Sequence, residues 1–356
     1  MDGIKNMNTG KNTSVINILF AIDYSKGETG YISKLIEIVE SLENVKVITG
    51  LSKFWKKTEG IDLVIINWPD YLFNWKKKIT DQEILKLTET LKFYQSKGTK
   101  LLTVVHDEYA HHTRNKNRDL IFDICYSNSD ILAHLGDYSL KKYTEKYFRL
   151  GIKNVLLYHP LFNYKFDKLD QGLLKKQYSL VGKNVVLVPG NIRNFNELKL
   201  VLKTFRNIVD TNKYLIIQRI GFNRGNLGFC NKLWYNFFLK FHSNKILIVG
   251  TSPVDQSKLV ELFTLSDIVL LSRFNILNSG NLILANQFNK RIIGFETGNI
   301  TEWLKFSNDY VLDKNNLKQM RLTKGDLICN KSKFLDKIND DSIREQFYQI
   351  LTYLNL

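Results

Sequence analysis

Short apolar runs rich in β-branched residues alternate along the chain with stretches whose apolar residues recur at helical spacing. Continuous apolar runs of this kind are typical of strands buried on both faces of a parallel sheet. The predicted strands occupy residues 15–22, 45–48, 62–69, 101–106, 155–160, 184–188, 214–221, 245–250, 267–271 and 291–295. The predicted helices include residues 31–42, 84–96, 198–209, 259–266 and 282–288. The steady alternation predicts doubly wound parallel sheets of the α/β class.

Four further stretches complete the predicted organisation. Residues 123–135 include another strand, residues 138–149 form a basic and aromatic helix, and residues 342–356 form an amphipathic helix. The polar segment 165–178 is predicted to link two domains, which a chain of 356 residues is long enough to build. We predict three parts, which span residues 1–170, 171–338 and 339–356.

Composition narrows the class of protein. The chain is 44% hydrophobic and 24% charged, which is typical of a globular protein, and its formal net charge is +16. Such a charge fits nucleic acid, an anionic membrane surface or phosphorylated substrates as partners. The three cysteines have no metal-ligand spacing and predict free thiols in a reducing compartment. Residues 1–14 lack the apolar core of a signal peptide, and no run is long enough to span a bilayer, which predicts a cytoplasmic protein.

Polar, glycine-containing turns follow three predicted strands of the second half. The first contains Gly190 and Arg193, the second contains Asn278, Ser279 and Gly280, and the third covers residues 296–299. Glycine lets a ligand approach the backbone, and the first turn of a helix offers unpaired N–H groups that suit a phosphate. Because ligands of open α/β sheets bind at the carboxyl edge, these turns predict an anion site there.

The order of these elements resembles the nucleotide-binding segment of GT-B glycosyltransferases, in particular the family 4 or group 1 enzymes of bacterial polysaccharide synthesis. In that group a Ser-Gly loop, a helix of the type L-x-L-A, a strand, a Gly turn and a Glu follow one another. The matching residues are Ser279, Gly280, 282–285, 290–293, Gly298 and Glu302. Residues 184–197 resemble the segment G-x-I-R-x-[YF]-K, with Asn196 at the Lys position. The acidic pair of the family, E-x7-E, falls on Ile276 and Leu284, so both carboxylates are missing and the branch is divergent.

This resemblance implies a GT-B fold, in which two Rossmann-like domains face a cleft and the C-terminal helix packs back on the first domain. It implies a UDP- or GDP-linked sugar as donor, and neither a metal nor another cofactor, because basic side chains neutralise the leaving diphosphate. The missing lysine charge is then supplied by Arg219, Arg224 or Arg273. The implied donor-binding residues are Gly190, Arg193, Arg219, Arg273, Asn278, Ser279, Gly280, Glu296, Thr297 and Asn299.

Two strand ends of the first half carry further candidates. Trp68 and Tyr71 lie in a segment that resembles a W-P-[DE] motif of some polysaccharide glycosyltransferases, and they either stack on an acceptor or close the core. The catalytic candidates are His106, Asp107 and Glu108, because a His or Asp at this point of GT-B enzymes faces the cleft. His111 and His112 are adjacent rather than four residues apart, so we predict no zinc site.

The implied function is sugar transfer to a glycan or polyprenyl-diphosphate-linked acceptor in surface polysaccharide biosynthesis. The basic helix 138–149 would hold the enzyme to the anionic inner face of the plasma membrane. Two alternatives stay open: a non-catalytic GT-B homologue that acts as a partner subunit, and a basic nucleic-acid-binding protein. The second lacks the sequence signatures of the common nucleic-acid-binding modules, so we expect no nucleic-acid partner. The donor sugar, the acceptor, the stereochemical course and the choice among His106, Asp107 and Glu108 as the base stay open.

Overall fold

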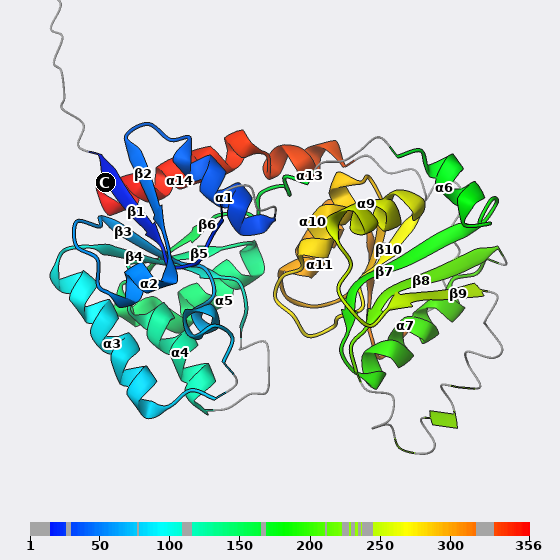
Figure 1. Ribbon diagram of the computed structural model, residues 1–356, viewed down its shortest axis with the longest axis horizontal. Coiled ribbons are helices and arrows are strands. Elements are labelled where there is room, and N and C mark those ends of the chain that lie inside the picture. Colours follow the sequence, from blue (N-terminus) through cyan, green and yellow to red (C-terminus); the bar gives the residue numbers. More distant parts are fainter. Residues whose placement is uncertain are drawn as a thin grey trace, which may run out of the picture.

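Two sheets of parallel strands, each covered by helices on both faces, form the two halves of the molecule (Figure 1). The computed structural model describes residues 15–25, 30–76, 78–108, 116–164, 169–210, 212–222, 228, 232–233, 236, 245–317 and 331–356. His111, His112 and Arg224 lie outside the described residues, and the predictions made for them are therefore not carried further.

The first sheet has six strands in the order β2-β1-β3-β4-β5-β6. They are β1 (Ile16–Phe20), β2 (Val45–Thr49), β3 (Leu63–Ile66), β4 (Lys100–Val105), β5 (Ile131–His134) and β6 (Lys153–Leu156). The connecting helices are α1 (Tyr31–Glu40), α2 (Leu51–Trp55), η1 (Pro69–Phe73), α3 (Asp81–Ser96), α4 (Lys116–Ser127), α5 (Asp137–Tyr147) and η2 (Phe148–Leu150). The order of strands reverses between β1 and β3, which makes this pair the switch point of the first sheet.

The second sheet has six strands in the order β12-β11-β10-β7-β8-β9. They are β7 (Asn184–Ile192), β8 (Lys213–Ile220), β9 (Ile246–Gly250), β10 (Ile268–Leu270), β11 (Arg291–Phe295) and β12 (Tyr310–Leu312). The helices are α6 (Gln171–Gln177), α7 (Phe195–Asn207), α9 (Gln256–Leu265), α10 (Gly280–Gln287), α11 (Gly298–Phe306), α13 (Ser332–Lys337) and α14 (Asp340–Leu354). The switch point lies between β7 and β10, and this is the strand order of a dinucleotide-binding domain.

The strands form where the sequence predicts them because their side chains are buried on both faces of each sheet. Every residue of β3, β5, β10 and β11 is buried, as a continuous apolar run requires. Helix starts follow local capping chemistry: Thr80 and Glu83 form a reciprocal capping box at α3, and Asn194 accepts a hydrogen bond from the Glu197 N–H at α7. In both domains the local capping residues and the burial of the apolar strands therefore favour the same secondary structure.

Three predictions of local structure need correction. Residues 123–127 belong to α4, and only Ile131–His134 is a strand, because the apolar residues at 121, 122 and 125 lie on one helical face. The segment 165–178 contains α6, whose start is capped by the side chain of Asp170 and which packs on α9. The turn predicted over 296–299 is shorter, since α11 begins at Gly298.

The helix α14 leaves the second domain and lies along the first, as Figure 1 shows in red. Its side chains Ile343, Phe347 and Ile350 are fully buried in the core that α1 also enters. The Lys34 ammonium of α1 donates to Asp340 at 2.6 Å, and Gln346 accepts from the Tyr158 N–H at 2.8 Å. The C-terminal segment therefore completes the first domain.

None of the helices in the part of the chain described here is both long and apolar enough to cross a lipid bilayer.

Candidate functional site

The carboxyl edges of the two sheets face each other, which brings residues of both domains to one place. From the second domain come the loops after β7, β8 and β10 and the start of α10; from the first come the loops after β3 and β4. The clearest link is Asn278, whose side-chain amide donates to the His106 carbonyl oxygen across the domains at 2.8 Å. Open α/β sheets bind ligands at this edge, so the candidate site lies here.

Three arginines of the second domain converge at its switch point. Arg193 follows β7, Arg219 lies near the end of β8, and Arg273 follows β10. Burial and, after it, the positive charges of Arg193 and Arg219 lower the pKa of Arg273 to about 10, while Glu197 and Asp107 oppose the shift. The three guanidinium groups are therefore close enough to repel one another. A cluster of like charges of this kind is stabilised when an anion enters it.

Two backbone features lie beside these arginines. Gly190 has φ +78°, and a β-carbon placed on it would lie 3.0 Å from the side-chain nitrogen of Asn281, in the first turn of α10. The loop after β7 therefore contacts the start of α10. Ser279 precedes α10 without capping it through its side chain; the Leu282 N–H bonds to the Ser279 carbonyl oxygen at 3.1 Å, and the N–H groups of Gly280 and Asn281 stand ahead of it at the start of the helix. Gly190, Ser279 and Gly280 thus lie together, as the sequence predicts.

The residues predicted near the nucleoside have different surroundings. Glu296 is exposed at the end of β11, while the Thr297 hydroxyl donates to the Ile276 carbonyl at 2.9 Å. Asn299 is fully buried, accepts from the Ser139 N–H at 2.9 Å and donates to the Asn278 side chain at 2.8 Å. In this conformation the Thr297 and Asn299 side chains bond to protein groups, and Glu296 is the one left facing solvent.

The start of α5 receives a second contact from the same helix. Both carboxylate oxygens of Glu302 on α11 accept backbone N–H groups, from Asp137 at 2.7 Å and from Tyr138 at 2.8 Å. Together with Asn299, this carboxylate fixes α11 of the second domain to α5 of the first. The position of the two domains relative to each other at the site is therefore fixed by interdomain hydrogen bonds as well as by the linker.

The three catalytic candidates of the first domain differ in their environment. Glu108 is bound to the Lys142 ammonium at 2.8 Å. His106 lies between the rings of Tyr31 and Trp68, with both ring centroids 5.1 Å from its own. Asp107 is the one whose charge interacts with the arginines. Burial and, after it, the Asp70 carboxylate raise its pKa to about 8, while Arg273 and Arg193 oppose the rise.

The two acceptor candidates follow β3 and belong to an aromatic cluster. The Trp68 ring lies 5.9 Å from Tyr31 and 6.0 Å from Trp75, and Tyr71 lies 5.7 Å from Trp75. Trp68 and Tyr71 are both half-buried. They therefore contribute to the core and also keep part of their surface exposed.

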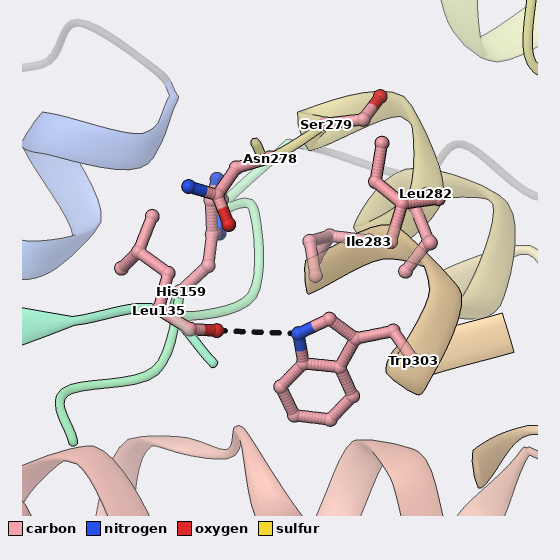
Figure 2. Close-up of a pocket in the computed structure, with 8 residues that line it drawn as sticks. Leu135, His159, Asn278, Ser279, Leu282, Ile283 and Trp303 are labelled. Carbon is pink, nitrogen blue, oxygen red and sulfur yellow. Dashed lines mark hydrogen bonds between the residues drawn. The ribbon is translucent and has the colours of Figure 1, made fainter. Parts of the chain in front are cut away.

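A small pocket lies at the domain interface beside the start of α10 (Figure 2). It holds about 270 Å³ of empty space, part of it open to solvent, and is lined by Leu135, His159, Asn278, Ser279, Leu282, Ile283, Ile300 and Trp303. The indole N–H of Trp303 donates to the Leu135 carbonyl at 3.2 Å across one side. The lining is mainly apolar, with the polar groups gathered near Ser279.

His159 is the titratable group of this pocket. Its Nδ1 donates to the Pro160 carbonyl oxygen at 2.5 Å, because a carbonyl can only accept, so the neutral ring carries its proton on Nδ1. Burial lowers the pKa of His159 to about 4, and the ring is therefore neutral at physiological pH. The free acceptor Nε2 lies near Gly280, since a β-carbon on that glycine would be 3.8 Å from it.

The sequence did not single out four residues of this region. Asp70 is buried after β3, 3.4 Å from the Arg118 guanidinium, and acts on the charge of Asp107. Tyr31 belongs to the aromatic cluster, Asn67 directly precedes Trp68, and His159 lines the pocket. Asp70 is the acidic residue of the W-P-[DE] segment, but no role could be assigned to it or to the other three from the sequence.

Comparison with known proteins gives structural matches alone. No family model matches the sequence, and no curated protein matches it. The UDP complex of Anabaena Alr3699/HepE matches with TM-score 0.66 at 13% identity, over 95% of this chain and 100% of that one. Sucrose-phosphate synthase from Thermosynechococcus elongatus matches with TM-score 0.60 at 11% identity, over 95% and 98%. The lipopolysaccharide outer core galactosyltransferase WaaB matches with TM-score 0.58 at 12% identity, over 95% and 99%.

Identities this low carry no conclusion about substrate, but the agreement extends over both domains and their connection. The two parallel sheets with flanking helices are those of the architecture expected from the sequence. The resemblance to GT-B glycosyltransferases is thus confirmed at the level of the fold, and the chain is a two-domain α/β protein of the GT-B fold.

Proposed function

We propose that this protein transfers a sugar from a nucleoside-diphosphate sugar to the hydroxyl of an acceptor. One observation carries the proposal: Arg193, Arg219 and Arg273 converge beside the first turn of α10 and act on the charge of Asp107 in the other domain. The site therefore pairs an anion-binding group with a carboxylate across a cleft. Sugar transfer needs this pair, because a diphosphate leaves while a hydroxyl loses its proton.

On the donor side, the arginines and the N-terminus of α10 would hold the diphosphate. Guanidinium groups bind phosphate oxygens in pairs, and a helix N-terminus adds unpaired N–H groups. Positive charge at this position stabilises the leaving diphosphate most when bond cleavage is advanced, so it lowers the barrier without requiring a metal. The solved structure of HepE contains UDP, and those of other matching proteins contain UDP or a UDP-sugar, which supports a uridine nucleotide as the first donor to test.

On the acceptor side, Asp107 is our choice for the base. Its pKa of about 8 suits the abstraction of a proton near neutral pH, and its side chain is 14% exposed, so an acceptor can reach it. Glu108 is engaged by Lys142, and His106 packs between aromatic rings. Asp107 would accept the proton of the attacking hydroxyl. The positive charge of Arg273 lowers the pKa of Asp107 and so stabilises its carboxylate form.

We further propose that the acceptor is part of a surface polysaccharide or its lipid-linked precursor, and that the enzyme works at the inner membrane face. The net charge of +16 supports attraction to an anionic surface. Two lysines of α5 contribute less than expected, since Lys142 binds Glu108 and Lys146 binds Asp123 at 2.7 Å. The exposed Phe148 and Leu150 at the end of that helix add an apolar component.

The missing acidic pair favours one alternative, a non-catalytic partner subunit. Leu284 is buried in α10, and Ile276 packs against the core, so neither position offers a carboxylate to a sugar ring. The two proposals share the fold and differ in whether a donor is bound and cleaved. A single set of experiments separates them.

The test is a thermal-shift panel with UDP, GDP, ADP, CMP and their sugars, followed by donor hydrolysis. A nucleotide at about 100 times its Kd adds about 2.7 kcal/mol to the free energy of unfolding, which is readily measured. We expect one nucleotide to stabilise the protein selectively and Arg193→Ala to abolish both the stabilisation and the release of nucleotide from its sugar. If the nucleotide stabilises but the sugar stays attached with every acceptor mixture, the partner-subunit alternative holds.

A further inference from the structure

The aromatic cluster at the carboxyl edge of the first sheet has features of a second ligand site. It consists of Tyr31, Trp68, Trp75 and His106, contributed by α1, the two ends of η1 and the loop after β4. The Trp68 ring is its centre, 5.1 Å from His106, 5.9 Å from Tyr31 and 6.0 Å from Trp75 between centroids. These rings meet largely edge to face, which is a favourable aromatic geometry and holds them in fixed positions.

Two buried polar side chains, Tyr31 of the cluster and Asn67, which directly precedes Trp68 in the chain, have no hydrogen-bond partner among the described residues. Tyr31 is 7% exposed and Asn67 is 4% exposed. Among the residues that the structure describes, neither the Tyr31 hydroxyl nor either polar atom of the Asn67 amide is bonded to another group. Buried polar groups almost always have a partner, and an amide with both its donor and its acceptor unused is rare. The pair therefore points to a ligand that supplies both kinds of group.

The charges around the cluster restrict that ligand. One carboxylate oxygen of Asp107 lies 3.9 Å from Nδ1 of His106, and Asp70, which acts on the charge of Asp107, is already bound to Arg118. Lys142 is bound to Glu108. The arginines that suit a phosphate lie across the cleft on the second domain. Phosphate on this side would face buried carboxylates, whereas an uncharged ligand would meet aromatic faces, a hydroxyl and an amide.

We propose that this cluster binds the acceptor as an uncharged sugar ring, with Asn67 and Tyr31 as the residues that recognise its hydroxyl or acetamido groups. The apolar face of the ring would pack against Trp68, and the attacking hydroxyl would point to Asp107. Any phosphate of a lipid-linked acceptor then lies beyond this subsite, outside the carboxylates. The inference rests on the proposed sugar transfer and adds the class of acceptor to it.

The test uses the full chain with UDP present and neutral glycosides as probes. Saturation-transfer NMR would compare p-nitrophenyl glucoside, galactoside and N-acetylglucosaminide with glucose 1-phosphate and glucose 6-phosphate. We expect the neutral glycosides to bind and the phosphates not to bind. Tyr31→Phe and Asn67→Leu should each weaken the best glycoside about tenfold, which is the effect of losing a hydrogen bond to a neutral group.

A second readout separates recognition from damage to the fold. Because the Tyr31 hydroxyl and the Asn67 amide are unpartnered in the described structure, their removal should leave the melting temperature of the free protein unchanged or higher. Tyr94→Phe is the matched control: its buried hydroxyl donates to the Phe54 carbonyl at 3.2 Å, so its loss should lower the melting temperature and leave glycoside binding intact.

The outcomes distinguish this inference from the proposed function. UDP stabilisation without binding of any neutral glycoside, or glycoside binding that both variants retain, overturns the acceptor subsite and leaves the donor site standing. Preference for the sugar phosphates overturns it as well. Absence of UDP binding in the wild type overturns the proposed function itself. If Asn67→Leu fails to fold, Tyr31→Phe alone decides, since it removes a single oxygen atom.

Discussion

Replacing Arg273 by methionine should make the free protein more stable and its nucleotide binding weaker. Burial and the neighbouring Arg193 and Arg219 lower the pKa of Arg273 from 12.5 to about 10. That difference corresponds to about 3 kcal/mol of unfavourable free energy for the charged form in the folded state. At pH 7 the side chain is charged both folded and unfolded, so the whole cost is present, and it is relieved only above about pH 10.

Methionine keeps the apolar stem of the side chain and removes the charge. We therefore expect the free energy of unfolding to rise by about 1–3 kcal/mol, which is a rise of several degrees in melting temperature for a domain of this size. The same change removes a charge-assisted hydrogen bond to phosphate, so the Kd for UDP should rise about tenfold or more. Stability and affinity would move in opposite directions.

The assay is chemical denaturation of the wild type and the variant, each with and without saturating UDP. Arg206→Met is the control, because Arg206 is exposed in the last turn of α7 and outside the cluster, and it should change neither quantity appreciably. A variant at 273 that is less stable than the wild type and still gains the full stabilisation from UDP would refute the electrostatic argument.

Three further substitutions test other parts of the structure. Asp70→Asn should lower the pKa of Asp107 from about 8, because it removes the second cause of the rise after burial; NMR titration of the carboxyl group measures it. Gly298→Ala should destabilise by about 1–3 kcal/mol, since φ is +44° and the new β-carbon would lie 2.6 Å from the Leu277 carbonyl oxygen. His134→Gln should make the free energy of unfolding depend less on pH below 6.5. Burial lowers the pKa of His134 from 6.5 to about 4, so on acidification the unfolded state of the wild type takes up the proton before the folded state does. The wild type should therefore lose about 2–3 kcal/mol of stability by pH 4.5.

Each of these has an outcome that contradicts it. An unchanged titration of Asp107 would mean that Asp70 does not act on it. A Gly298→Ala protein as stable as the wild type would show that the turn before α11 relaxes freely. Equal slopes of stability against pH between 6.5 and 4.5 for His134→Gln and the wild type would place the acid sensitivity elsewhere, with His159 as the next residue to replace.

The fold was predictable because its strands are unambiguous. Runs such as residues 267–271 are apolar, β-branched and short, and a parallel strand buried on both faces is the structure that uses them. The errors occurred where two elements share one apolar stretch: residues 123–135 contain the end of a helix and a strand, and periodicity cannot divide them. Element ends depend on tertiary contacts that a local pattern does not contain.

The sequence pointed to the residues of the candidate site in the second domain but not to all of those in the first. The sequence indicates that Gly190 and Arg193 lie at the carboxyl edge of the sheet, and the structure confirms this place in the fold; their predicted role toward a phosphate stays a prediction. Tyr31 and Asn67 could not be found, because their distinguishing property is the lack of a partner in three dimensions. Asn299 shows the opposite case: a polar residue at a strand end resembles a ligand-binding residue in sequence, and the structure gives its amide to Ser139 and Asn278.

The return of α14 to the first domain has a consequence for synthesis on the ribosome. Lys34 and its partner Asp340 are 306 residues apart in sequence, and Tyr158 and Gln346 are 188 apart. All strands of the first sheet therefore emerge long before the helix that covers α1, and the apolar surface of α1 stays uncovered while the second domain is made. The first domain of this protein begins to fold first and is finished last, which makes the interval between those events the period in which a nascent chain most needs protection from aggregation.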